Sequence, residues 1–424
     1  MPIQRLCDFL DHSPTAWHAC ALLKEQLLGA GFQELDEKER WHIAAGKSYF
    51  VIRNQGSLIA FHMPHKPPES AAVLAAHTDS PGLKLKPQGE FSAEGASLLN
   101  FEVYGSPILA SWIGRDLTLS GRVFYQNGSG EVLSQLVSLP ELSLIIPHLA
   151  IHLDARVNES GLLLNKQEHI TALAATSIEE KQLDSLLDNL LKSKLGADTI
   201  IYKELFATPQ EQARRLGLQQ ELLASARLDN LAHVVSATEA FLAQKPHTGG
   251  LLKAVVFWNH EEVGSTTSEG AASSFFEDVF HRIALASGLE TDAYYALKAR
   301  SICFSCDVAH AVHPNYPEKH DPRHKPHLGK GIALKTNAQE RYISNSPLTA
   351  RVIAQWQQRK LPYQFFVSRN DMPCGTTIGP IHASRTGLQT IDMGIPLLGM
   401  HAAREVIHVQ DYLDSIKALE VVWE

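Results

Sequence analysis

Neither a membrane-spanning segment nor an excess of positive charge is found in this sequence. None of its apolar runs approaches the roughly 20 residues that a helix needs to cross a bilayer, so no membrane partner is expected. Of the 424 residues, 46 are acidic and 38 are basic, which gives a formal charge of −8. A polyphosphate partner requires a basic surface, so this balance argues against nucleic acid as a partner.

Cysteine is also scarce. The five cysteines are an odd and scattered set that does not form a disulfide framework. The first residues, MPIQRLCDFLDHSP, carry acidic residues early and lack a basic segment followed by an apolar core, so they are not typical of a signal peptide. Both observations favour a cytoplasmic protein. Internal repeats and low-complexity segments are missing as well.

Histidine, in contrast, is abundant. The 21 histidines are roughly double the number that average composition gives for this length, which justifies a search for a metal site. Five of them lie between His310 and His327, in a segment whose prolines and lysines indicate a rigid loop at a crevice rim or an oligomer interface.

Apolar runs and helical periodicity predict an α/β protein. Helices are expected in the first forty residues and over 231–242, where apolar residues recur at 3.6 spacing. Strands are expected at 49–54, 57–63, 71–76, 251–258, 301–306, 362–368 and 388–394. Strands that alternate with helices favour a mostly parallel sheet covered on both faces. Residues 87–223 differ, with alternating stretches and a helical stretch over 178–195, and we interpret them as a domain inserted into one formed by 1–86 and 224–424.

Acidic residues and histidines gather where the strands of this sheet end. The carboxyl ends of parallel strands converge on one crevice, so side chains placed there are expected to meet. Two histidines and three carboxylates from separate segments suit a pair of zinc-like ions bridged by one carboxylate. The residues in these positions are His77, Asp229 at a helix start, Glu261, Glu262, Asp307 and His401.

Each of these residues alone has an ordinary structural explanation. A histidine after a strand is usually hydrogen-bonded structure, an aspartate at a helix start is usually an N-cap, and a Glu-Glu pair is usually a solvated turn. Their coincidence at one crevice favours a metal site. Asp79 is two residues from His77 and can reach its ring on the same side of an extended segment. Glu261 and Glu262 point differently, so one can bind metal while the other meets a water.

Six ordered blocks resemble one known family closely. They are AAHTDSPGLKLKP, SARLDNL, NHEEVGS, CDVAHAVHPNY, NDMPCGTTIGP and MHAARE. These blocks are similar to those of the M18 aminopeptidases, the aspartyl aminopeptidase family, and the similarity runs from Ser13-Pro14-Thr15 to the C-terminal helix. The resemblance implies a phosphorylase/hydrolase-like α/β/α catalytic domain with an inserted β-rich dimerisation domain. It also implies dimers assembled into a tetrahedral dodecamer.

The resemblance implies a role for each matching residue. Two divalent metal ions per subunit would be bound, with Asp229 bridging them; zinc is expected, and manganese or cobalt also suit nitrogen and oxygen ligands. Glu261 would be the general base and Asp79 would orient His77. The implied metal ligands are His77, Asp229, Glu262, Asp307 and His401.

Contacts to substrate are implied at three further positions. His152 would reach the active site of a neighbouring subunit, although a zinc set of His77, His152 and His401 is an alternative. Lys335 and Tyr342 match the family's lysine and tyrosine at this spacing and would suit a substrate whose first residue is acidic.

The sequence as a whole predicts a metalloaminopeptidase that removes N-terminal Asp or Glu from peptides, using a water activated between two metals. One alternative is a broader or non-acidic specificity, because Glu340 stands where the family usually has Gln and adds a negative charge nearby. Another is a catalytically idle, self-assembling scaffold.

Overall fold

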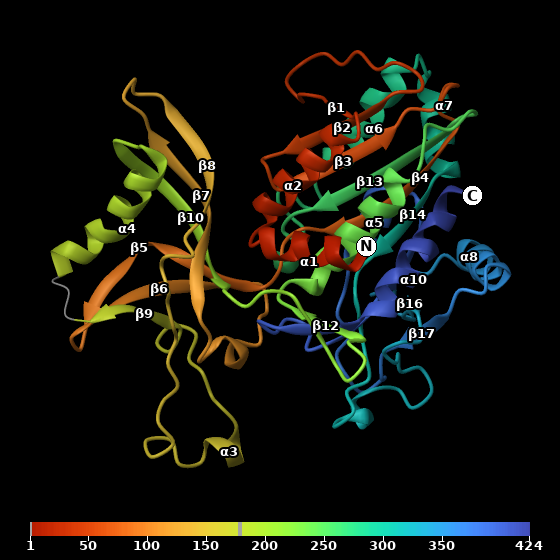
Figure 1. Cartoon of the computed structure of the whole chain (residues 1–424). Coiled ribbons are helices and arrows are strands. Elements are labelled where there is room, and N and C mark those ends of the chain that lie inside the picture. Colours follow the sequence, from red (N-terminus) through yellow and green to blue (C-terminus); the bar gives the residue numbers. More distant parts are fainter. Residues whose placement is uncertain (1, 177–179) are drawn as a thin grey trace. The chain divides into compact units, whose positions relative to one another are not determined.

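The chain forms two compact units, seen in a computed structural model that describes residues 2–176 and 180–424 (Figure 1). The first unit comprises Met1–Asp79, Ala213–Met400 and Glu405–Glu424, and the second comprises Ser80–Gln212 and His401–Arg404. The boundaries predicted from the sequence are 86/87 and 223/224. The short segment 401–404 is predicted to belong to the catalytic domain, whereas the structure groups it with the second unit.

The first unit is built on a nine-stranded sheet in the described part of the chain. Its four central strands are parallel, because β4 pairs in parallel with β13 and β14, and β14 does so with β18. In spatial order the strands are β1 (Gln33–Glu34), β2 (Ser48–Arg53), β3 (Ser57–His62), β13 (Leu251–Trp258), β4 (Ser70–His77), β14 (Ile302–Cys306), β18 (Gln389–Gly394), β16 (Ile332–Thr336) and β17 (Tyr363–Val367).

Helices cover both faces of this sheet, because its central strands are apolar on both sides. Successive residues of β4 alternate between two cores, with Val73 in one and Leu74 in the other. The Leu74 core is closed by α1 (Pro2–His12), α2 (Ala16–Gly29), α5 (Leu228–Leu242), α8 (Ser346–Gln358) and α10 (Val409–Glu420). The Val73 core is closed by α6 (Phe275–Ala286), α7 (Thr291–Arg300) and α9 (Ile378–Thr386).

A smaller sheet in the same unit brings distant segments to the start of α5. Its β12 pairs with β20 so that Ser225 lies opposite Glu405. In order, its strands are β11 (Arg214–Leu216), β12 (Leu222–Ser225), β20 (Glu405–His408), β19 (Pro396–Leu398) and β15 (Ala309–His310). Three short 3-10 helices complete the unit: η2 (Glu261–Val263), η3 (Pro317–Lys319) and η4 (Val421–Trp423).

The second unit is an antiparallel six-stranded sheet with its own apolar core. Helix α4 (Glu180–Leu195) packs Leu187 and Leu191 into this core; residues 178 and 179, the predicted start of that helix, lie outside the described residues. Two short helices, η1 (Leu109–Trp112) and α3 (Val157–Ser160), accompany it. The strand order is β8 (Val132–Ser138), β7 (Leu117–Gln126), β10 (Thr199–Pro209), β5 (Gly82–Ala93), β6 (Ala96–Tyr104) and β9 (Thr171–Thr176).

The predicted α/β class is confirmed, and each apolar run assigned to a strand lies in one. A hairpin around Asn54 joins β2 to β3, with Arg53 opposite Ser57. The sheet is mostly parallel, as predicted; its antiparallel pairs are β2 with β3, β3 with β13, and β16 with β18. Among the described residues, no helix is both long enough and apolar enough to cross a membrane.

A buried histidine makes the stability of the first unit depend on pH. His382 is fully buried, with its ring centroid 4.8 Å from that of Phe276, and burial lowers its pKa to about 4. The unfolded chain takes up this proton near pH 6.5, so stability is lost as the pH falls from about 6.5 towards 4. As the pH falls from 7.5 to 5, we expect the free energy of unfolding of His382→Phe to rise by about 2 kcal/mol relative to that of the wild type. Urea unfolding at both pH values measures this; parallel pH dependences would contradict it.

Candidate metal centre

His77 is the last residue of β4 and lies at the centre of the parallel strands. Its side chain is buried, and its Nδ1 lies 3.0 Å from the carbonyl oxygen of Asp79. With the ring proton on Nδ1, that contact is a hydrogen bond, and Nε2 is the atom that faces the carboxylates of the cluster. Nε2 lies 3.4 Å from Asp229 Oδ1 and 3.7 Å from Asp307 Oδ1.

Asp229 is held at the start of α5 by main-chain contacts. Its backbone is not yet helical, and its peptide bond with Asn230 is cis. Its N–H donates to Glu405 Oε2 at 2.9 Å, and Asn230 Nδ2 donates to the carbonyl oxygen of Cys306 at 2.7 Å. These bonds tie the aspartate to β20 and to the end of β14. Arg227, which precedes α5, makes no side-chain capping bond.

Asp79 holds the turn that carries the two glutamates. Its Oδ1 accepts the N–H of Glu261 at 3.1 Å and its Oδ2 accepts the N–H of Glu262 at 3.1 Å. Its Oδ1 also lies 3.5 Å from His77 Nδ1. The contact with His77 was predicted from the sequence, but the two hydrogen bonds from the turn to Asp79 were not. Asp79 therefore fixes three residues of the cluster relative to one another.

Asp307 follows β14 and is paired with a buried lysine. Lys335 Nζ lies 3.3 Å from Asp307 Oδ2 and 5.2 Å from the centre of the Tyr342 ring. Burial acts to raise the pKa of Asp307, but the charges of Lys335 and His77 outweigh it, so the pKa is lowered. The predicted substrate residues Lys335 and Tyr342 are therefore buried together beside the cluster.

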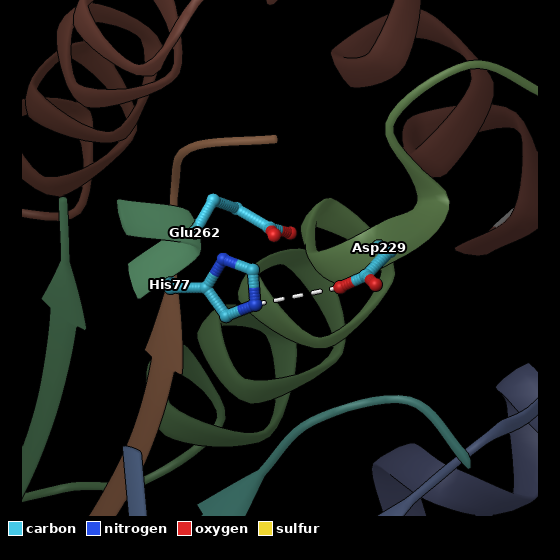
Figure 2. A group of neighbouring side chains, drawn as sticks. All are labelled: His77, Asp229 and Glu262. Atoms are coloured by element: carbon cyan, nitrogen blue, oxygen red, sulfur yellow. Dashed lines mark ion pairs between the residues drawn. The ribbon is translucent and has the colours of Figure 1, made fainter. Parts of the chain in front are cut away.

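Figure 2 shows the side chains of His77, Asp229 and Glu262 converging from β4, α5 and the turn after β13. One donor atom from each lies within 4.8 Å of the others. Burial raises the pKa of Glu261 to about 8; the charge of His77 opposes this shift, and neighbouring aspartates add to it. Burial and Asp229 likewise raise the pKa of Glu262 well above its usual range.

These residues fit divalent metal ions. Buried carboxylates that raise one another's pKa are stabilised when they are paired or coordinate a cation. One imidazole nitrogen surrounded by carboxylate oxygens is a donor set that suits zinc and also manganese or cobalt. Among the described residues, this is where histidine and acidic donor atoms come close enough to hold an ion, and the His310–His327 segment forms no such group.

His152 and His401 lie in the second unit. His401 Nδ1 is 3.0 Å from the carbonyl oxygen of Ser106, and its own carbonyl oxygen accepts the N–H of Ile108 at 2.8 Å. His152 is an exposed residue of the segment between β8 and α3. Their roles as metal ligand and substrate contact remain predictions.

Glu405 supports the cluster and was not among the residues predicted from the sequence. It is buried and accepts the N–H of Asp229, although the two residues are 176 positions apart. It belongs to the MHAARE block, so its sequence neighbourhood was noticed but its partner was not. A residue that holds the main chain of a metal-binding residue can be found only once the fold is known.

Comparison with known proteins shows to which family the chain belongs. Residues 9–423 match the family described as aminopeptidase I zinc metalloprotease (M18). A probable M18 family aminopeptidase 2 from Azotobacter vinelandii is 39% identical over 422 residues, covering 98% of this chain and 96% of the relative. One from Pseudomonas aeruginosa is 40% identical over 422 residues, with the same coverage.

Solved structures are similar over nearly the whole chain. Ape4, in a complex with Nbr1, superposes with a TM-score of 0.94 at 35% identity and covers 100% of this chain and 85% of its own. The structure of prApe1 gives 0.92 at 26% identity, with coverage of 99% and 93%. The chain therefore belongs to the M18 family and is a metallohydrolase of the aminopeptidase type.

Proposed function

We propose that this aminopeptidase removes N-terminal residues from peptides, with a preference for Asp and Glu, using two divalent metal ions per chain. The observation that carries the proposal is the convergence of the buried His77 and Asp229 with the half-buried Glu262, with Asp307 next to them. In the proposed site these four residues and His401 would hold the metals, and Asp229 would be a ligand of both ions. Bound ions of this kind polarise the scissile carbonyl and acidify a water molecule.

Glu261 is the proposed general base. It shares a turn with Glu262, and the main-chain bonds to Asp79 hold the two glutamates side by side. Its carboxylate accepts the proton of the attacking water and returns it to the leaving amine. A carboxylate beside the reacting atoms suits both directions of this transfer, because it can accept a proton and then donate it.

Lys335 supports the proposed acidic preference. It is a buried cation beside Asp307, and its Nζ also lies over the ring of Tyr342. A cation in a dry setting favours a carboxylate, because the interaction is weakly screened there. His152 is proposed to contact substrate in a neighbouring subunit.

The proposed assembly is a tetrahedral dodecamer of twelve chains, built from dimers that form through the second unit. One similar structure is titled a dodecamer of S. cerevisiae mApe1, with a TM-score of 0.84 and 27% identity. A cytoplasmic location is also proposed, and the five free cysteines of the structure support it.

The function is tested by reconstituting the protein with zinc and measuring hydrolysis of Asp-, Glu-, Leu- and Lys-amides. We expect two zinc ions per chain, a light-scattering mass of twelve chains, and kcat/KM values at least tenfold higher for Asp and Glu than for Leu. Faster cleavage of Leu would favour the broader specificity. Two bound ions with no cleavage of any substrate would favour the idle scaffold.

A further inference from the structure

The chain on both sides of the loop of residues 337–342 is bound to one residue of the neighbouring strand. Lys335, near the end of β16, is the cross-strand partner of Asp392 in β18. The chain returns at Ile343, whose N–H donates to Asp392 Oδ2 at 2.7 Å and whose carbonyl oxygen accepts the N–H of Asp392 at 2.9 Å. Asp392 thus closes the loop with both its side chain and its main chain.

The same carboxylate also holds a second segment. Thr377 Oγ1 donates to Asp392 Oδ1 at 2.9 Å, at the start of α9. The segment just before it supports the 337–342 loop, because Arg341 donates to the carbonyl oxygen of Cys374 at 3.5 Å. Asn337 Nδ2 lies 3.5 Å from the sulfur of the same cysteine. The two segments that surround Tyr342 therefore meet at one carboxylate.

Asp392 is placed for support and not for contact with substrate. It is only 1% exposed, and both carboxylate oxygens accept hydrogen bonds from the protein. Burial raises its pKa to about 6, although the charge of Lys335 and the hydrogen bonds from Ile343 and Thr377 act in the other direction. A Cβ at Gly379 would lie 2.4 Å from Asp392 Oδ1, so the carboxylate can occupy this position only because residue 379 has no side chain.

We propose that Asp392 is a positioning residue that closes the 337–342 loop and thereby sets the places of Lys335 and Tyr342 in the site. The inference rests on the proposed function for the part that concerns substrate. Its consequence is that specificity depends on a buried aspartate that no substrate touches. The loop closure itself is a property of the folded chain and can be measured without substrate.

Two variants disturb Asp392 in different ways, and a third serves as a matched control. Asp392→Asn removes the charge and one acceptor oxygen. Gly379→Ala keeps Asp392 but displaces its carboxylate, in a helix that alanine otherwise favours. Asp411→Asn is the control, because Asp411 is another buried aspartate that accepts two loop N–H groups, those of Gly329 at 2.7 Å and Gly331 at 2.8 Å.

The first readout is limited trypsin digestion of the full zinc-loaded protein, followed by mass spectrometry of fragments that end at the exposed Arg341. We expect cleavage there to be at least tenfold faster in Asp392→Asn and Gly379→Ala than in the wild type or Asp411→Asn. Equal rates in all four proteins would overturn the inference.

The second readout is the separation of KM from kcat. In both test variants we expect KM for Asp- and Glu-amides to rise at least tenfold, with kcat within threefold and KM for Leu-amide within twofold. Equal losses for all substrates, matched by Asp411→Asn, would indicate a purely structural role and overturn the inference. If the wild type cleaves no amide, the proposed function fails, while the digestion rates still decide whether Asp392 closes the loop.

Discussion

The Glu261→Gln variant is expected to lose about 10³-fold in kcat while it retains its zinc, because removal of a general base typically costs 10²- to 10⁴-fold. Glutamine has nearly the same shape as glutamate and keeps the N–H bond to Asp79, so the turn and Glu262 stay in place. It cannot accept a proton from water at neutral pH. Steady-state kinetics on Asp-amide, together with metal content by atomic absorption, measure both quantities.

Glu269→Gln is the matched control for this substitution. Glu269 is a buried acid on the same loop, where its Oε2 accepts a hydrogen bond from Asn259 at 2.9 Å. We expect this variant to keep kcat within a few-fold of the wild type. A Glu261→Gln enzyme that retains a tenth or more of wild-type kcat would show that another group moves the proton.

The Asp79→Asn variant is expected to bind zinc about 10- to 100-fold more weakly, the usual effect of losing a partner that orients metal ligands. The aspartate accepts two N–H groups, and an asparagine would turn its NH₂ group towards one of them. Either Glu261 or Glu262 then loses its main-chain anchor. Competition titration with a zinc chelator gives the affinity, and kcat at saturating zinc shows how far the general base has moved.

Asp321→Asn controls for the loss of an aspartate that caps two main-chain N–H groups. Asp321 accepts those of Arg323 at 2.9 Å and His324 at 3.0 Å in an exposed loop. We expect its zinc affinity to match that of the wild type. Unchanged affinity in a folded Asp79→Asn protein would instead show that His77 and Glu262 are held without Asp79.

The sheet and the core of the cluster were predictable because they depend on local sequence. The run Ala71–Ala76 is apolar on every residue, and Leu251–Trp258 is apolar except at Lys253, which suits strands buried on both faces. The carboxyl ends of such strands meet at one edge, so His77 and Asp307 could be placed near each other before the fold was known.

The remaining features depend on contacts between distant segments. The hydrogen bond between Asp79 and Glu261 joins residues that are 182 positions apart, and the sequence around either residue does not indicate its partner. The segment 401–404 follows a strand of the first unit, so the sequence placed it there. The side chain of Ala403 joins the core of the second unit and its N–H donates to Ser111 Oγ, a preference that chain order does not contain.

The strand that ends at His77 has a consequence for how specificity can change. Between Ser70 and His77, β4 consists of four alanines, one valine and one leucine, and these side chains supply both cores. Small side chains let helices approach a sheet closely, and such dense packing leaves little volume for larger replacements. Substitutions by larger side chains in β4, below the site, are therefore expected to be poorly tolerated. New substrate preferences on this scaffold would have to arise in the rim loops, where insertions and exchanges are tolerated.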